Sequence, residues 1–282
     1  MQKISACMVV YNEEEMLPTC LDSVKDVVDE IIIVLDGPSS DRTFEIAKKY
    51  TDKVFVRSNI GHGEPHRPFT FKKARGDWIL WLDADEVLST EMRKNLRRLA
   101  EDPDVDAYGF LWDTFYGRKP IRKGYFANFH KICFFRKKAL KTFYGMPNEG
   151  IRMQGNVKNT PYRLIHNQRG ERNTMWYFWN KNMSIIRLHS QMVVDLGLGK
   201  RNPFFYLFKA PVWFFAYLAY NMAKGALTSG KAGLSICFQQ ALYNFFLYWY
   251  VFQYKLFPRT KSGKVTKWLR KAGGPYMHKI NK

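Results

Sequence analysis

Three short apolar runs in the first 85 residues constrain the fold of this 282-residue chain more than any other feature. They are Ile4–Tyr11, Glu30–Leu35 and Asp77–Leu82. Each run is rich in Ile, Val, Leu or Trp, and none alternates between polar and apolar residues. This is the pattern of strands buried on both faces of a parallel sheet. Helical patterns separate the runs, so the sequence predicts a doubly wound α/β domain.

Further elements are expected along the chain. Helices are predicted from Asn12, as a cap, toward Val24, over Thr43–Tyr50 with Ser40 or Asp41 as cap, over Thr90–Ala100, and over residues 175–192. A weaker strand is predicted over Lys53–Arg57. Two aromatic-rich segments are interpreted as later, partly antiparallel strands that close the sheet: Asp106–Phe115 and His130–Arg136.

Charge divides the chain into two unlike halves. Residues 1–110 carry 21 acids and 15 bases, whereas residues 111–282 carry 4 acids and 30 bases, and no acid follows Asp195. So large a positive excess indicates an anionic partner, which is a nucleic acid, a phospholipid surface or a phosphorylated substrate. No helix-turn-helix, RNP or zinc-finger pattern accompanies the bases, so we expect no nucleic-acid partner.

Two strongly apolar blocks, Pro203–Met222 and Leu234–Phe257, lie in the basic half. Each is about long enough to cross a bilayer, which takes roughly 20 apolar residues. Their polar content, Pro211 and their many Trp and Tyr residues fit helices that lie in the membrane interface better. Spanning helices and a buried helix pair stay open as alternatives. The tail 255–282 has nine Lys or Arg and no acid, and is expected to bind anionic phospholipid.

The sequence thus predicts an enzyme-like domain over residues 1–195 and a basic, aromatic, membrane-associating helical region over residues 196–282. The four cysteines fit neither a metal-binding spacing nor a dense disulfide framework. The apolar stretch that follows Met1 is short for a signal peptide. We therefore expect a cytoplasmic protein that attaches peripherally to the inner face of the cell membrane.

Acidic residues follow the predicted strands at the points where the strands end. Asp36 follows the second run, and Asp83 and Asp85 follow the third. Ligands of open α/β sheets sit beyond the carboxyl ends of the strands, so these acids are expected to face one crevice. Two carboxylates spaced i, i+2 can reach one hard divalent cation, which takes other ligands from substrate phosphates. An acidic turn that caps the next helix is the alternative.

The turn after the second apolar run, which begins with Asp36, has its own interpretation. Asp36 can accept hydrogen bonds from a nucleobase imide or a ribose hydroxyl, which makes it a candidate ligand of a nucleotide. Asp41, five residues later, is also acidic but is suited to do no more than cap its helix.

Three motifs resemble those of family 2 glycosyltransferases of the GT-A type. They are V-V-Y-N-E-E from Val9, L-D-G-P-S-S-D-R-T from Leu35 and G-D-W-I-L-W-L-D-A-D-E from Gly76. Together they cover about residues 4–100 and are most similar to the bacterial lipopolysaccharide-core β-1,4-glucosyltransferase-like branch. A weaker likeness continues to about residue 257. The resemblance implies a GT-A fold, which is a Rossmann-like, mostly parallel sheet flanked by helices, with the catalytic domain over residues 1–195.

The resemblance also implies the chemistry. The donor would be a nucleotide-diphosphate sugar, taken here as a UDP-sugar with glucose, used with Mg²⁺ or Mn²⁺ and with inversion at the anomeric carbon. The nucleotide pocket would be lined by Tyr11, Glu13 and Asp36. Asp83 would approach the ribose or the metal, and Asp85 would bind the metal through the diphosphate. His166 is a candidate third metal ligand, although a lone histidine is more often structural.

A single displacement needs a carboxylate that takes the proton of the acceptor hydroxyl. Glu149 lies in the loop-like segment G-M-P-N-E-G and matches the position where the family often places its catalytic base. A simple turn acid is the alternative. The branch usually has His-Glu where this chain has Asn148-Glu149. His62, His66 and Arg67, in the loop before the third run, are candidates to approach the donor phosphates.

The leading hypothesis is an inverting hexosyltransferase that acts on a lipid-linked or lipopolysaccharide-type acceptor at the cytoplasmic membrane face. The rival is a non-catalytic nucleotide-binding or membrane scaffold protein of the same fold, because fold alone does not fix function. A nucleotidyltransferase also uses paired carboxylates and a metal. It would normally show a Gly-rich phosphate loop after the first strand, where this chain has Tyr11-Asn12-Glu13-Glu14.

Overall fold

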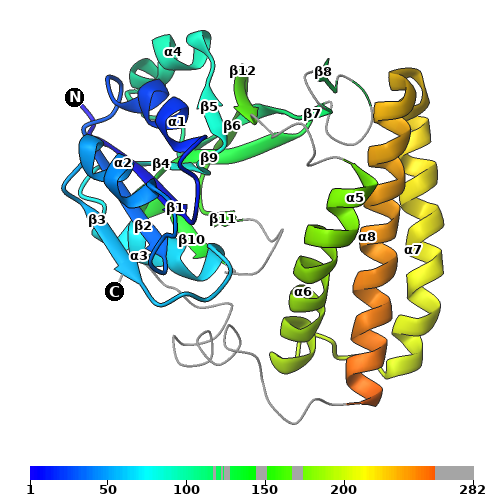
Figure 1. Cartoon of the computed structure of the whole chain (residues 1–282). Coiled ribbons are helices and arrows are strands. Elements are labelled where there is room, and N and C mark those ends of the chain that lie inside the picture. Colours follow the sequence, from blue (N-terminus) through cyan, green and yellow to red (C-terminus); the bar gives the residue numbers. More distant parts are fainter. Residues whose placement is uncertain (117–118, 122, 124–127, 144–150, 167–173, 258–282) are drawn as a thin grey trace. The chain divides into compact units, whose positions relative to one another are not determined.

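The structure, a computed structural model, describes residues 1–116, 119–121, 123, 128–143, 151–166 and 174–257 (Figure 1). Contacts group the described residues into two compact units. The first unit contains residues 1–112 and 130–166 and is an α/β domain. The second contains the described residues of 113–129 together with 174–257 and is built mainly of helices.

The first unit is organised around an eight-stranded sheet of order β3-β2-β1-β4-β9-β6-β12-β5. β1 pairs in parallel with β2 and β4, and β2 pairs in parallel with β3, whereas β9 is antiparallel to both β4 and β6. β3, β2, β1, β4 and β6 therefore point the same way, which confirms the expected mostly parallel sheet. The strands are β1 Ile4–Val10, β2 Glu30–Asp36, β3 Val54–Arg57, β4 Trp78–Leu82, β5 Glu86–Leu88, β6 Ala107–Asp113, β9 His130–Arg136 and β12 Val157–His166.

Alternate side chains of each strand point to opposite faces of the sheet, and both sets are apolar here. Helices therefore cover both faces. On one face, Ala6 and Met8 of β1 pack in a core with α1 (Leu17–Val24), α2 (Thr43–Tyr50) and α4 (Thr90–Ala100). On the other face, Cys7 packs in a core with Phe71 of α3 (Arg67–Lys73) and with the ribbon of β10 (Leu140–Phe143) and β11 (Ile151–Met153). Two short 3₁₀ turns complete the unit, η1 Glu64–His66 and η2 Lys137–Ala139. The central strands are thus buried on both faces, as their sequence predicts.

Aromatic stacking joins the parallel and antiparallel halves of the sheet. Trp78 of β4 is fully buried and stacks on Phe134 of β9, with ring centroids 4.5 Å apart, and on Tyr108 of β6 at 5.8 Å. The indole N–H of Trp78 is buried and has no hydrogen-bond partner among the described residues. Trp78 therefore contributes through its ring, whose centroid also lies 4.8 Å from Arg136 Cζ, rather than through its N–H.

The second unit contains three long helices. α8 (Gly230–Leu256) packs against both α6 (Met183–Asp195) and α7 (Pro203–Ala223). α7 begins at a clear cap, because the Asn202 side chain accepts a hydrogen bond from the Phe205 N–H at 2.9 Å. The shorter elements are β7 Phe115–Tyr116, β8 Lys119–Pro120, α5 Met175–Tyr177, the π-helix η3 Phe178–Asn182 and the 3₁₀ helix η4 Ala226–Ser229. Within the described ranges, no helix combines the length and apolar character that crossing a membrane requires.

Most of the expected elements are present within four residues of their predicted ends, but Asp106–Phe115 is divided into β6 and β7, and residues 175–192 form α5, η3 and α6 instead of one helix. Thr43–Tyr50 and Thr90–Ala100 are helices with those bounds, and the apolar blocks form α7 and α8. The predicted domain boundary at residue 195 stays a prediction, although contacts place the residues from 174 onward with the second unit. The tail beyond residue 257 lies outside the described residues.

The prediction that Asn12 caps the first helix is wrong. α1 begins at Leu17, and its N-cap residue Met16 makes no side-chain capping bond. Asn12 instead adopts a left-handed backbone conformation with φ 52°, which Asn tolerates better than most residues. Its side chain makes two hydrogen bonds to Ser40, at 2.9 and 3.0 Å, and so ties the loop after β1 to the loop after β2.

Substituting Trp78 tests the aromatic junction. We expect Trp78→Ala to lower the free energy of unfolding by about 3–5 kcal/mol, because it leaves a large cavity between β4, β6 and β9. Trp78→Phe should cost much less, since it keeps a ring and removes an unpaired N–H. Urea unfolding of both variants measures the difference, and equal losses for the two would contradict the stacking account.

Candidate active site

The carboxyl ends of three parallel strands meet at one edge of the sheet. β1 lies between β2 and β4, with Val10 paired to Leu35 and Met8 paired to Leu82. The loops that follow these strands therefore begin side by side. This confirms the prediction that the polar strand ends converge, and the acids at positions 36, 83 and 85 lie at that edge.

Asp36 organises the loop that follows β3. Its carboxylate accepts hydrogen bonds from the backbone N–H groups of Ile60 at 2.6 Å and His62 at 2.9 Å, and it contacts His66 Nε2 at 3.0 Å. Burial raises the pKa of Asp36, but the hydrogen bond from His66 and those from the backbone outweigh burial and hold the pKa below its ordinary value. Asp36 is therefore a fixed, ionised carboxylate at the end of β2.

Asp83 and Glu86 share one ammonium group at the end of β4. Lys131 of β9 places its Nζ 2.9 Å from Asp83 Oδ2 and 2.6 and 2.7 Å from the two Glu86 carboxylate oxygens. Asp83 also pairs with the guanidinium of Arg67, at the start of α3, and its backbone N–H donates to Glu86 at 2.9 Å. Trp81 lies beneath both cations, with its ring centroid 4.6 Å from Arg67 Cζ and 4.8 Å from Lys131 Nζ.

The two carboxyl groups respond to this environment in opposite directions. Burial raises the pKa of Asp83, yet Arg67 and Lys131 together bring it well below the ordinary value. Burial also raises the pKa of Glu86, and there Lys131 does not fully offset the burial and the negative charge of Asp83. Burial lowers the pKa of Lys131, whereas the two carboxylates more than reverse this. Asp83 and Lys131 therefore carry the firmly fixed charges of the cluster.

Asp85 and His166 form a second contact beside the first. His166 Nε2 lies 3.1 Å from Asp85 Oδ2, and both side chains are largely buried. The contact forms because β12 runs antiparallel to β5 with His166 opposite Glu86, and the imidazole stacks on Trp112 with ring centroids 4.2 Å apart. Trp112 also donates to Glu86 at 2.7 Å. Two residues 81 positions apart in the chain thus lie side by side, and their role as metal ligands stays a prediction.

The donor set fits a divalent cation only in part. One carboxylate and one imidazole are suitable ligands, and substrate phosphates and water complete such a set in many nucleotide sites. Among the described side chains, no group of three or more His, Cys, Asp or Glu is arranged to hold a metal. Asp83 is held by Arg67 and Lys131 instead, and its role as a metal ligand stays a prediction.

The remaining predicted site residues lie apart from this cluster or are not among the residues that the structure describes. Tyr11 is 44% exposed and Glu13 is half-buried in the loop after β1, where the Glu13 N–H donates to Thr43 Oγ1 at 2.7 Å. Their places in the nucleotide pocket stay predictions. The prediction that Ser40 or Asp41 is the cap of Thr43–Tyr50 is wrong, because Arg42 is the N-cap residue of α2 and makes no side-chain capping bond, although Asp41 accepts a hydrogen bond from the Thr43 N–H at 3.0 Å. Glu149, the predicted catalytic base, lies outside the described residues.

Sequence reasoning missed Lys131, Glu86 and Trp112. Glu86 is part of the D-A-D-E motif, and its signal was its position directly after two acids at a buried strand end. Lys131 is the second residue of a strand that also contains His130 and Arg136, so it carries only a weak signal on its own. Of the loop residues considered for phosphates, Arg67 contacts Asp83, His66 contacts Asp36, and His62 contacts Glu64 at 2.9 Å.

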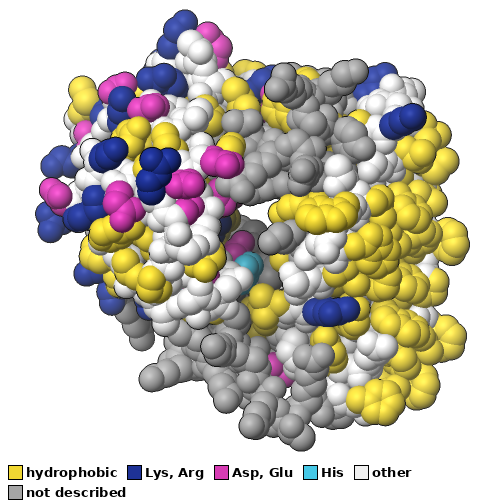
Figure 2. All heavy atoms as spheres, in the orientation of Figure 1, with side chains coloured by type: hydrophobic (Ala, Val, Ile, Leu, Met, Phe, Trp, Pro, Cys, Tyr) yellow, Lys and Arg dark blue, Asp and Glu magenta, His cyan; other side chains and the backbone are white. Residues whose placement is uncertain are grey.

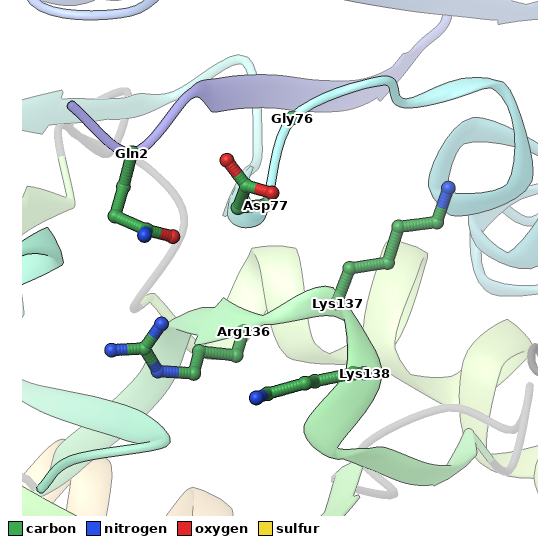
Figure 3. A pocket seen from close by; sticks show the side chains of 6 residues that line it. All are labelled: Gln2, Gly76, Asp77, Arg136, Lys137 and Lys138. Carbon is green, nitrogen blue, oxygen red and sulfur yellow. The ribbon is translucent and has the colours of Figure 1, made fainter. Parts of the chain in front are cut away.

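A separate hollow of about 440 Å³ lies at the opposite edge of the sheet (Figure 3). Gln2 and Asp77, which precede β1 and β4, line it together with Arg136, Lys137 and Lys138. Arg136 and Lys137 are committed to backbone carbonyls, at 2.8 Å from Asp102 O and 2.6 Å from Ala74 O. This hollow is therefore distinct from the acidic edge, and its cations stabilise the loops around it.

An α/β domain with acids at the carboxyl ends of neighbouring parallel strands has the architecture of a nucleotide-binding domain. Residues 5–185 match the family described as Glycosyl transferase family 2, and the chain belongs to this family. It is 36% identical over 108 residues to an uncharacterized glycosyltransferase of Rickettsia felis, a match that covers 38% of each chain.

Two further similarities extend this comparison. The chain is 33% identical over 99 residues to the poly(ribitol-phosphate) beta-glucosyltransferase of Bacillus spizizenii, covering 32% of this chain and 16% of the relative. The crystal structure of S. aureus TarS has 14% identity and a TM-score of 0.45, covering 86% of this chain and 55% of that one. The chain thus spans well under two thirds of the length of the curated relatives that it matches.

Removing Lys131 tests the charge cluster. We expect Lys131→Met to lower the free energy of unfolding by about 3–5 kcal/mol, because it leaves buried carboxylates with too little positive charge. Adding Glu86→Gln should recover part of the loss, since it removes a carboxylate that the ammonium had paired. Urea unfolding of both single variants and the double variant gives the coupling energy. Additive losses would contradict a shared interaction.

Proposed function

We propose that this chain is an inverting glycosyltransferase that transfers a hexose from a nucleotide-diphosphate sugar to an acceptor hydroxyl. The observation that carries the proposal is the acidic edge, where Asp36 ends β2 and Asp83 and Asp85 follow β4, the two parallel strands on either side of β1, in a domain of glycosyl transferase family 2. UDP-glucose is the proposed donor. The Bacillus spizizenii relative, by its name a beta-glucosyltransferase, supports this choice.

The residues of the edge would bind and orient the donor. Asp36 uses both carboxylate oxygens to hold the loop of residues 60–66 in place, and a ribose or a nucleobase would lie against this end of β2. Tyr11 and Glu13 would line the same pocket from the loop after β1. Asp83 is held in one orientation by Arg67 and Lys131, so it is positioned before the donor arrives.

Asp85 and His166 would hold Mg²⁺ or Mn²⁺. When bound, the ion would neutralise the negative charge that accumulates on the leaving diphosphate. The stacking of His166 on Trp112 fixes the plane of the imidazole, and the neighbouring strands β5 and β12 fix its distance from Asp85.

Glu149 would act as the catalytic base. It would take the proton of the acceptor hydroxyl as the oxygen attacks the anomeric carbon and the nucleoside diphosphate leaves from the opposite side. This step needs a carboxylate that is ionised at the operating pH and lies within hydrogen-bond reach of the acceptor.

The proposed acceptor is lipid-linked or of the lipopolysaccharide type, at the cytoplasmic face of the membrane, to which the chain would attach peripherally. The excess of 30 bases over 4 acids in residues 111–282 supports an anionic acceptor and an anionic membrane surface. The assignment to the lipopolysaccharide-core β-1,4-glucosyltransferase-like branch belongs to this proposal.

Substituting Asp85 tests the donor site. We expect Asp85→Asn to lower the rate of UDP release from UDP-glucose in the presence of Mn²⁺ by at least about 10–100-fold, because it removes a charged oxygen ligand. The matched control is Asp52→Asn, whose side chain is fully exposed and lies 3.9 Å from Lys48 Nζ. A wild-type rate for Asp85→Asn, with the fold intact by thermal unfolding, would show that Asp85 has no such role.

Substituting Glu149 separates a transferase from a non-catalytic scaffold of the same fold. Glu149→Gln should bind UDP-glucose with wild-type affinity and lose transfer by about 10²–10⁴-fold, since only the proton acceptor is lost. Calorimetric titration with the donor and a radiolabelled-sugar transfer assay measure the two quantities. Donor binding with no transfer in the wild-type chain, across lipid-linked acceptors, would favour the scaffold.

A further inference from the structure

α7 presents a continuous apolar stripe on its outward side. Exposed residues recur every three or four positions along the helix, which places them on one face. They are Phe204, Phe208, Val212, Phe215, Ala219 and Met222. Phe208, Val212 and Phe215 are the most exposed of these, at 71%, 64% and 65%. Figure 2 shows the hydrophobic side chains that gather over this part of the second unit.

Phe208, Val212 and Phe215, the most exposed residues of the stripe, point away from the neighbouring helix α8, whereas the ring centroid of Phe204 at the start of the stripe lies 6.1 Å from that of Phe252 of α8. Tyr206 and Ala210 of α7 are buried, and Tyr206 stacks on Tyr248 of α8 with centroids 6.3 Å apart. Phe214 likewise contacts Phe238 of α8 at 5.9 Å. α7 therefore already uses one side to pack within the second unit, and the stripe is a second apolar side.

The size and make-up of the stripe indicate an interaction surface. Its 19 residues of helix extend about 28 Å at 1.5 Å per residue. Contiguous exposed apolar patches of this kind are uncommon on soluble domains and mark binding surfaces. Lys209 does not interrupt the stripe, because its ammonium lies 4.3 Å from the ring centroid of Tyr248, on the α8 side.

Charge identifies the partner. Lys200 and Arg201 precede α7, Lys224 follows it, all three are exposed, and the sequence has no acid after Asp195. A second copy of the chain on this face would bring cations together with no acid from this region to pair them, which disfavours a symmetric dimer. A bilayer with anionic headgroups offers both an apolar layer for the stripe and phosphates for the cations.

We propose that the outward face of α7 lies in the plane of an anionic phospholipid bilayer, with Phe208, Val212 and Phe215 among the acyl chains and the flanking cations at the headgroups. An in-plane arrangement agrees with the finding that none of the described helices is suited to span a membrane. The inference rests on the membrane attachment in the proposed function and names its surface and lipid class. It does not depend on glycosyl transfer.

An environment-sensitive fluorophore tests which surface enters the lipid. The four native cysteines are buried, so a label on Val212→Cys is selective in the folded full-length chain. With vesicles of phosphatidylcholine and phosphatidylglycerol, we expect a blue shift and about a twofold or greater rise in emission at position 212. The matched control is Val56→Cys on β3, also an exposed valine, where no change is expected. Equal spectra at position 212 with and without vesicles would overturn the proposal.

A pair of substitutions tests the apolar contribution to binding. Phe208→Ser with Phe215→Ser should weaken partitioning into these vesicles by about tenfold or more, most clearly at high salt, where attraction between the cations and the lipid is screened. Phe44→Ser on α2 is the control with unchanged partitioning, and thermal unfolding verifies the fold of each variant.

The outcomes distinguish this proposal from its rivals. Unchanged partitioning of the double variant would overturn it. Light scattering gives a second test: the proposal would also be overturned if the wild type were a dimer, the double variant were a monomer, and the double variant still bound vesicles. Stronger binding to phosphatidylcholine alone than to the mixed vesicles would contradict the anionic preference. The rate of UDP release from UDP-glucose in solution should be the same in the double variant and the wild type. A loss of this reaction would therefore count against the proposed function and not against the membrane surface.

Discussion

Asp83 and Glu86 lie together at the end of a strand whose five residues are all buried, and their carboxyl groups share the ammonium of Lys131. Two carboxylates so close would repel each other and would be costly to remove from water. Lys131, with Arg67 on the other side of Asp83, offsets that cost and keeps Asp83 ionised. The acidic edge of the sheet depends on this arrangement, because it fixes the loop that carries Asp85.

The same cluster connects distant parts of the sequence. Lys131 comes from β9, Arg67 from the start of α3, Trp112 from the end of β6, and His166 from β12. Lys131 and His166 reach the edge on strands that run antiparallel to a neighbour, Trp112 comes from the end of β6, which points the same way as β4, and Arg67 lies where α3 begins. The mixed half of the sheet therefore supplies the groups that pair with the acids of the parallel half.

The sequence was sufficient to predict the parallel strands and the edge at which their acids meet. Buried strands in an α/β domain have unbroken apolar sequences, and the polar residues that follow them must lie at the carboxyl ends of these strands. His166 was named as a candidate metal ligand from a family resemblance, whereas its direct contact with Asp85 was not predicted, since the pairing of β5 with β12 is not visible in local patterns. The long-range partner Lys131 had no such signal.

Asn12 shows a different limit of sequence reasoning. An Asn before a helical pattern is a good cap by composition, but the chain makes an additional turn before α1 begins and uses the side chain to hold Ser40. The competing hydrogen bond between two loops decided the outcome. Asp41, in a similar sequence context, bonds both the Thr43 N–H at the start of its helix and the Glu14 N–H of the neighbouring loop, while Arg42 is the N-cap residue. Local preference is therefore a weak guide to the cap where a neighbouring loop offers a partner to the same side chain.

Calorimetric titration of the chain with UDP-glucose, in Mn²⁺ and again in chelator, tests most directly whether the acidic edge is a donor site. Saturable binding at one site per chain in Mn²⁺, weakened strongly by chelator and by Asp36→Ala, is the result that the account predicts. Binding that is absent in Mn²⁺, or that persists unchanged in chelator and in Asp36→Ala, would contradict it.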